Sequence, residues 1–174
     1  VWRPCDTVEA VVAWASAIER RDGASCLIFS RQNAAFIDRD EVDADAIAMG
    51  GYVVAEAPLG EGEAQVVLLA TVGLAMDARA KLAALNINAR VVSMPCTNRF
   101  DRQSAEYRQS VLPPGLPVLA IEASKTDLWW KYFTGRGDVL GVDSFGESAP
   151  AKDLWIKFGF TVDNVVSKVE ALLQ

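Results

Sequence analysis

The stretch Gln65-Val66-Val67-Leu68-Leu69-Ala70-Thr71 decides the fold class of this chain. It is an apolar run of strand length without polar alternation, which is typical of a parallel sheet covered by helices on both faces. A helical pattern follows near residues 75–85, and another strand-like run lies at 89–94. This strand–helix–strand order predicts an α/β fold.

The chain from residue 52 onward extends the same sheet. Further strands are expected at 52–56, 118–122 and 139–142. Further helices are expected near 101–110 and 126–133, after Pro150, and after Thr161, where an apolar stripe should pack on the sheet. The turn-rich Gly60-Glu61-Gly62 predicts a hairpin between the first two strands, which would give one antiparallel edge. We therefore predict a three-layer, mainly parallel sheet with one antiparallel edge strand and helices on both faces.

Residues 1–49 form a separate unit in this prediction. Asp6, with Glu9 three positions later, predicts an N-capped helix over residues 7–21. The expected apolar face of that helix consists of Val8, Val11, Val12, Ala15 and Ile18. An apolar run at 25–29 predicts a strand buried on both faces. The acidic residues 34–49 lack the spacing of a calcium-binding loop, so they predict a solvated linker with a short helix.

Composition limits the class of function. The net charge of −6 argues against nucleic acid and anionic membranes as partners. The three cysteines lack a C-x-x-C pair, which indicates reduced thiols in a cytoplasmic protein. No apolar run approaches the roughly 18 residues of a membrane span.

The motif Ser30-Arg31-Gln32-Asn33 is the main candidate for a binding site. It follows the apolar run at 25–29, and α/β proteins usually place ligand groups where a buried strand ends. The guanidinium of Arg31 carries five donors in a rigid fork that suits phosphate or carboxylate. The alternative is an exposed arginine that only ends a strand. Gln32 and Asn33 are expected to bond backbone groups of the turn.

Together with this motif, further stretches resemble the transketolase family in its order and close to its spacing. They are Val1-Trp2-Arg3-Pro4-Cys5-Asp6, Gly50-Gly51-Tyr52-Val53, Ala89-Arg90-Val91-Val92-Ser93-Met94-Pro95, Tyr107-Arg108-Gln109-Ser110-Val111-Leu112-Pro113, Phe145-Gly146-Glu147-Ser148-Ala149-Pro150-Ala151 and Phe158-Gly159-Phe160-Thr161-Val162-Asp163-Asn164-Val165-Val166. The resemblance implies that residues 1–49 close the domain that binds the pyrimidine half of thiamine diphosphate and add a linker. Residues 50–174 would be the C-terminal domain.

The resemblance also implies an activity for the parent enzyme and a role for one residue. Transketolases transfer a two-carbon ketol unit between ketose and aldose phosphates in the pentose phosphate pathway. They act as homodimers with thiamine diphosphate and a divalent cation such as magnesium or calcium. Their Ser-Arg-Gln-Asn arginine binds the sugar phosphate, so Arg31 is the expected substrate-binding residue.

No catalytic, cofactor-binding or metal-binding residue is expected within this chain. It contains no histidine, whereas transketolases line their active site with several. We expect those groups, and the ligands of the cofactor and cation, in a region that precedes Val1. The chain alone is therefore expected to be inactive and to serve structure and dimerisation.

One position departs from the family pattern. After Thr71 transketolases typically continue with Gly-Ser-Glu-Val, whereas this chain continues with Val72 and lacks Gly-Ser-Glu. Such a turn at a helix N-terminus would offer free N–H groups to an anion. A second anion site is therefore not expected here.

Two other clusters favour structural interpretations. Glu147 and Ser148 have no histidine that could activate the serine, so they predict a turn into a helix. The aromatic residues Trp129, Trp130, Tyr132 and Phe133 lie on an acidic chain, which favours core packing or a subunit interface over nucleic-acid stacking.

Two alternatives stay open. Related thiamine-diphosphate enzymes, such as deoxyxylulose-phosphate synthase or a keto-acid dehydrogenase E1 component, share the C-terminal architecture, although the motifs favour transketolase. A stand-alone, non-catalytic α/β binding module would apply if the gene began near Val1.

Overall fold

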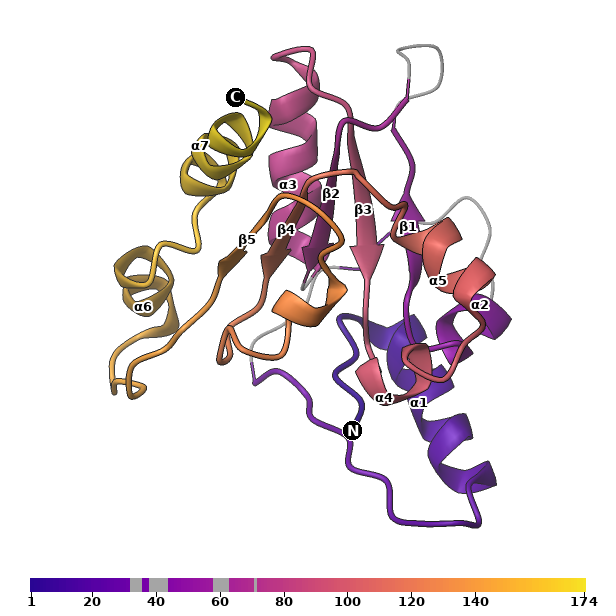
Figure 1. Cartoon of the computed structure of the whole chain (residues 1–174). Helices are drawn as coiled ribbons and strands as arrows, with labels where there is room; N and C mark the ends of the chain where they lie inside the picture. The colour runs from indigo at the N-terminus through magenta and orange to yellow at the C-terminus, as the bar shows by residue number, and fades with distance from the viewer. Residues whose placement is uncertain (32–35, 38–43, 58–62, 71) are drawn as a thin grey trace.

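The computed structural model describes residues 1–31, 36–37, 44–57, 63–70 and 72–174. Their centre is a five-stranded sheet with the order β1-β3-β2-β4-β5 (Figure 1). The strands are β1 (Tyr52–Ala55), β2 (Val66–Ala70), β3 (Ala89–Ser93), β4 (Val118–Ile121) and β5 (Gly137–Leu140). Strands β2 to β5 run parallel, and β1 lies antiparallel at the edge beside β3. The predicted fold class is confirmed.

The predicted hairpin between the first two strands is wrong. Tyr52 and Val53 of β1 pair with Ser93 and Val92 of β3, whereas β2 lies between β3 and β4. Every residue of β2 is buried, but only Tyr52 is buried in β1. The more apolar strand therefore occupies the centre of the sheet and the partly exposed strand occupies an edge. The turn at Gly60-Glu61-Gly62 lies outside the described residues.

Helices cover both faces of the sheet (Figure 1). One face carries α3 (Val72–Ala83) and α7 (Val162–Leu173), whose side chains pack with Val66 and Leu68 of β2. The other face carries α4 (Thr97–Phe100), α5 (Ala105–Val111) and the 3-10 helix η1 (Trp130–Tyr132), which pack with Val67 and Leu69. Successive side chains of a strand point to opposite faces, so β2 supplies both cores.

The last two helices begin and end near the predicted residues. Helix α6 (Ala151–Lys157) follows Pro150, and Gly159 adopts a φ of +78° just beyond its end. The Thr161 hydroxyl caps α7 by accepting a hydrogen bond from the Asn164 N–H at 3.3 Å. Val165 and Val169 of α7 are fully buried in the core beside α3. The predicted packing of the α7 stripe on its own sheet is confirmed.

The aromatic cluster packs mainly into the core. Trp129 and Tyr132 are buried, and the ring of Tyr132 meets Phe100 edge-on with centroids 5.9 Å apart. Trp130, in contrast, is about half exposed. The helix predicted over residues 126–133 is reduced to the single turn of η1.

The first helix, α1 (Thr7–Glu19), starts at the predicted cap, because the Asp6 carboxylate accepts the Glu9 N–H at 3.0 Å. Its packing face differs from the prediction. The buried residues are Glu9, Val12, Ala13 and Ser16, whereas Val11 and Ile18 are 64% and 67% exposed. The contacts of α1 with Tyr52 and Cys96 thus select a face that carries polar groups.

The prediction of a strand at 25–29 that is buried on both faces is wrong. Leu27 makes one parallel bridge to Trp2, and Ile28 and Phe29 are each 47% exposed. A strand buries both faces only when neighbouring strands and covering layers surround it. The predicted linker does contain a short helix, α2 (Ala44–Ala48). Among the described helices, none is long and apolar enough to cross a lipid bilayer.

Candidate functional site

The N-terminal segment, residues 1–5, links the motif around Arg31 to the end of β3. The Trp2 N–H donates to the Cys26 carbonyl at 2.8 Å, and the Ile28 N–H donates to the Trp2 carbonyl at 2.9 Å. The Arg3 N–H donates to the Pro95 carbonyl at 2.8 Å, just beyond β3. The extended segment that leads to Arg31 is therefore held near the carboxyl ends of the parallel strands.

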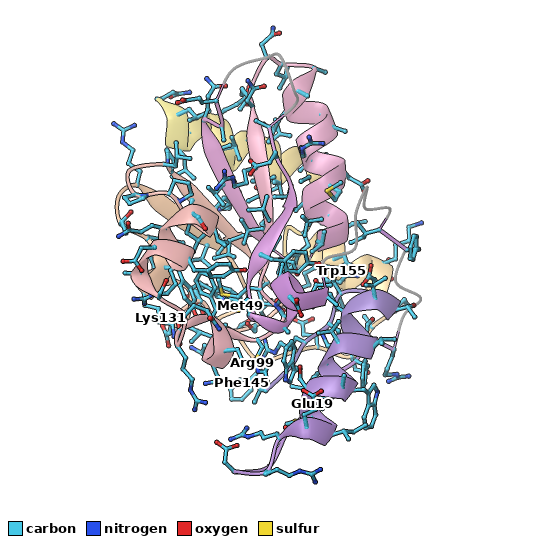
Figure 2. The ribbon with its side chains drawn as sticks, turned by 90° about the vertical axis from the view of Figure 1, so that its right-hand side faces the viewer. Glu19, Met49, Arg99, Lys131, Phe145 and Trp155 are labelled. Carbon is cyan, nitrogen blue, oxygen red and sulfur yellow. The ribbon has the colours of Figure 1, made fainter. Side chains whose placement is uncertain are left out.

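A cavity of ≈ 380 Å³, here called the strand-end cavity, lies where these parts meet. Ala70, Ser93 and Glu122 line it at the ends of β2, β3 and β4. The chain continues from β2 to β3 on one side and from β4 to β5 on the other, so the strand order reverses between β2 and β4. Ligands of open α/β sheets usually bind at such a point. Trp155 of α6, labelled in Figure 2, also lines the cavity.

Arg31 follows directly on the residues that close this cavity. Ile28, Phe29 and Ser30 line it, and Arg31 is the next residue along the chain. Arg31 is exposed and forms no ion pair with any carboxylate that the structure describes. Gln32 and Asn33, the other members of the predicted motif, lie outside the described residues. The described part of the chain thus leaves the Arg31 guanidinium accessible to an external anion.

Arg3 and Trp2 have structural contacts at the same place. The Arg3 guanidinium lies 3.7 Å from the Glu122 carboxylate, which is a loose ion pair at the cavity wall. The Trp2 ring is buried beside Ala13 and Cys96. The guanidinium of Arg99 lies 5.5 Å from the centre of that ring, in cation–π geometry. These contacts attach the N-terminal segment to the second half of the chain.

Sequence reasoning missed the most buried charged group of the described chain, Glu9, which is fully inaccessible to solvent. One oxygen of its carboxylate accepts from the Tyr52 hydroxyl at 2.8 Å and the Ser93 hydroxyl at 2.6 Å. The other oxygen accepts from the Cys5 N–H at 2.7 Å. We call Cys5, Glu9, Tyr52 and Ser93 the Glu9 network.

The sequence contains only part of the signal for this network. The spacing of Asp6 and Glu9 predicts a capping box, in which Glu9 would bond the backbone N–H of the cap residue itself. The carboxylate instead bonds the N–H of Cys5, one residue earlier. Its side-chain partners are 43 and 84 residues away in sequence, so no local pattern could identify them.

The Glu147–Ser148 motif is consistent with a structural role. Glu147 forms an ion pair with Lys157 of α6 at 2.6 Å, and Ser148 is exposed. The neighbouring Phe145, which is labelled in Figure 2, is 96% exposed. None of these contacts prepares a nucleophile.

A second, more polar cavity of ≈ 480 Å³ lies between α1 and α4. Glu19 and Arg99, which line it from these two helices, lie at the same end of the molecule in Figure 2. Two of the three arginines that line it have internal partners: Arg20 pairs with Asp22 at 2.8 Å, and Arg99 donates to the Ala48 carbonyl at 2.9 Å. These arginines stabilise the loops around α1.

The described groups with shifted pKa values are not among the residues that line the strand-end cavity. Hydrogen bonds from the backbone and side chain of Thr126 lower the pKa of Asp143, and Lys125 adds to the effect. Burial, with the neighbouring Asp101 carboxylate, raises the pKa of Tyr132. Neither group points to acid–base chemistry at the cavity.

Comparison with known proteins identifies the family. The model of the Transketolase-like TK C-terminal domain matches residues 50–161. Transketolase 1 of Pasteurella multocida and Transketolase 1 of Escherichia coli are each 49% identical to this chain over 176 residues. These alignments cover 99% of this chain but 26% of each relative. The chain therefore spans about a quarter of the length of these relatives.

Solved structures give the same result. A transketolase from Leishmania mexicana superposes with a TM-score of 0.85 at 37% identity, over 99% of this chain and 25% of that one. A Pichia stipitis transketolase in complex with sedoheptulose 7-phosphate superposes with a TM-score of 0.84 at 33% identity, with the same coverage. The chain therefore belongs to the transketolase family, of which it represents the C-terminal part.

Proposed function

We propose that the enzyme to which this chain belongs transfers a two-carbon ketol unit from a ketose phosphate to an aldose phosphate, as a step of the pentose phosphate pathway. Arg31 would bind the phosphate group of the sugar. Its part is to hold and orient the substrate, because a guanidinium fork bonds two phosphate oxygens in a defined geometry.

The position of Arg31 is the observation that carries this proposal. The side chain is exposed, follows the lining of the strand-end cavity and has no described carboxylate partner. A relative of known structure binds sedoheptulose 7-phosphate, a sugar phosphate. A phosphate on the sugar would supply the opposite charge that Arg31 can bond.

The proposal assigns thiamine diphosphate and a divalent cation, magnesium or calcium, to the parent enzyme. Among the described residues there is no cluster of three carboxylate or thiol side chains that could hold a metal ion. The whole chain also lacks histidine. We propose that other parts of the enzyme hold the cofactor and the cation, and we derive no step through them.

The remaining parts of the proposal concern organisation. Residues 1–49 would close the pyrimidine-binding domain and form the linker, and residues 50–174 would be the C-terminal domain. The family match over 50–161 supports this boundary. The enzyme would be a cytoplasmic homodimer to which this chain contributes structure and one substrate-binding arginine.

The test is an assay of the full-length enzyme with a ketose phosphate donor and an aldose phosphate acceptor, supplied with thiamine diphosphate and magnesium. Mass spectrometry should show a donor shortened by two carbons and an acceptor lengthened by two. Release of carbon dioxide from an α-keto acid, without ketol transfer between sugars, would favour the related keto-acid enzymes. Absence of both reactions would contradict the proposal.

A further inference from the structure

We propose that Glu9 is a positioning residue for Arg31: its buried carboxylate joins the N-terminal segment to β1 and β3 and thereby sets the place of the substrate arginine. This inference rests on the proposed function, because it assigns Glu9 a role in the same phosphate-binding site. Glu9 would not touch the substrate. It would act through the backbone that connects it to Arg31.

The first step of the argument is the burial of the carboxylate. Removing a carboxylate from water is strongly unfavourable unless hydrogen bonds compensate for the lost hydration. From described residues Glu9 accepts three such bonds, at 2.6, 2.7 and 2.8 Å. A helix that only needed an apolar face would be more stable with leucine at this position. The network therefore specifies one arrangement of the elements that it joins.

The second step is which elements these are. Glu9 and Cys5 belong to the start of α1 and the segment before it, Tyr52 begins β1, and Ser93 ends β3. Tyr52 and Ser93 are also partners in the antiparallel register. One carboxylate thus holds residues 5–9 against the end of the only antiparallel pair in the described sheet. Ser93 and Cys5 both line the strand-end cavity as well.

The third step is the connection to Arg31. Three residues before Cys5, Trp2 exchanges two backbone hydrogen bonds with Cys26 and Ile28. Residues 28–30 then run along the strand-end cavity to Arg31. Within this segment Ile28 and Phe29 are about half exposed, and Leu27 packs beside Trp2. A shift of residues 2–5 would therefore be transmitted to Arg31.

The test uses three variants of the full-length enzyme and one matched control. Glu9→Leu removes the acceptor for all three donors. Glu9→Gln keeps the same shape and all three contacts: its amide oxygen can accept from the Cys5 N–H, while its NH2 group can donate to the hydroxyl oxygens of Tyr52 and Ser93, which reverses the direction of those two bonds. Tyr52→Phe removes a single donor and should fold even if Glu9→Leu does not. The control is Tyr132→Phe, because Tyr132 is also buried and donates to a carboxylate, that of Asp101, at 2.9 Å.

The first readout is independent of the reaction. Hydrogen exchange of the Ile28 amide, which bonds the Trp2 carbonyl, should become at least tenfold faster in Tyr52→Phe and Glu9→Leu, because the pairing opens more often. Glu9→Gln should stay within about threefold of the wild type. Tyr132→Phe should leave this amide unchanged. Equal exchange of the Ile28 amide in all variants would overturn the inference.

The second readout is kinetic. Glu9→Leu and Tyr52→Phe should raise KM for a phosphorylated donor by about tenfold and about threefold respectively, with little change for an unphosphorylated donor. In an Arg31→Ala background, Glu9→Leu should add no further loss of this selectivity, since both changes act on the same contact. If Arg31→Ala shows no loss selective for phosphate, the proposed function of Arg31 fails. If Arg31→Ala shows a loss selective for phosphorylated donors but the Glu9 and Tyr52 variants do not, only the positioning role of Glu9 fails.

Discussion

At the scale of single residues, two side chains of residues 1–49 have contrasting environments. Arg31 is exposed at the end of an extended segment, whereas Glu9 on α1 is fully buried against β1 and β3. The exposed cation can meet a ligand, and the buried anion can only meet the protein. Binding and positioning are therefore assigned to different residues.

The contribution of Arg31 can be measured in the full-length enzyme. A charge-assisted hydrogen bond contributes about 1.5–3 kcal/mol, so Arg31→Ala should lower kcat/KM for phosphorylated donors by about 10- to 150-fold. The loss should appear in KM, because the contact binds the ground state and the transition state alike. An unphosphorylated donor should be affected little. Steady-state kinetics with both donors measures the difference.

Arg21→Ala is the matched control for this experiment. Arg21 is also exposed and lies in residues 1–49, but it does not line the strand-end cavity. Its replacement should leave both KM values unchanged. Equal losses for both donors in Arg31→Ala would contradict a phosphate contact.

At the scale of elements, hydrogen bonds at the ends of strands and helices fix the loops on the carboxyl side of the sheet. After β4, the N–H and hydroxyl of Thr126 bond the two carboxylate oxygens of Asp143, at 3.1 and 2.8 Å. Asp143 itself follows β5. This pair holds two loops next to each other, close to the residues that line the strand-end cavity.

The pH dependence of this pair follows from the lowered pKa of Asp143. Because the folded pKa lies below the unfolded value of about 3.9, the stabilisation is present above that pH and is lost as the pH falls through the folded pKa. Thr126→Val removes the hydroxyl bond but keeps the backbone bond, so the pKa of Asp143 should rise toward its usual range. An NMR titration of the Asp143 carboxyl carbon measures this shift.

Thr134→Val provides the comparison for the titration. The Thr134 hydroxyl bonds the Gly115 N–H, away from Asp143. That variant should leave the pKa of Asp143 where it is in the wild type. An unchanged pKa in Thr126→Val would mean that the hydroxyl bond does not hold the carboxylate.

At the scale of the whole molecule, β2 joins the two cores. Leu68 faces the core beside α3 and α7, and Leu69 faces the core beside α4 and α5. Both are fully buried. The N-terminal segment is attached through the Glu9 network and the contacts of Trp2, and Cys5 also packs against the core beside α3 and α7.

Truncation of a β2 side chain should therefore destabilise the whole sheet. Leu68→Ala should lower the free energy of unfolding by about 2–5 kcal/mol, because the surrounding core cannot fully close the space left behind. Leu85→Ala, at an exposed position after α3, should change it by less than about 0.5 kcal/mol. Chemical denaturation followed by circular dichroism compares the two. Similar small effects at both positions would contradict the central role of β2.

The amino-acid sequence by itself determined the features that depend on neighbouring residues. Asp6 and Thr161 act as helix caps, and the apolar run at 66–70 forms a buried strand, because these structures arise from side chains within a few positions of each other. The motif around Arg31 could be recognised for the same reason, and its role stays a prediction.

Only the tertiary structure decided that β1 pairs with β3 rather than β2, and that α1 buries Glu9 and leaves Val11 exposed. The first choice follows from burial of the most apolar strand at the centre of the sheet. The second follows from hydrogen bonds of one buried carboxylate to side chains 43 and 84 residues away, which outweigh the local apolar pattern.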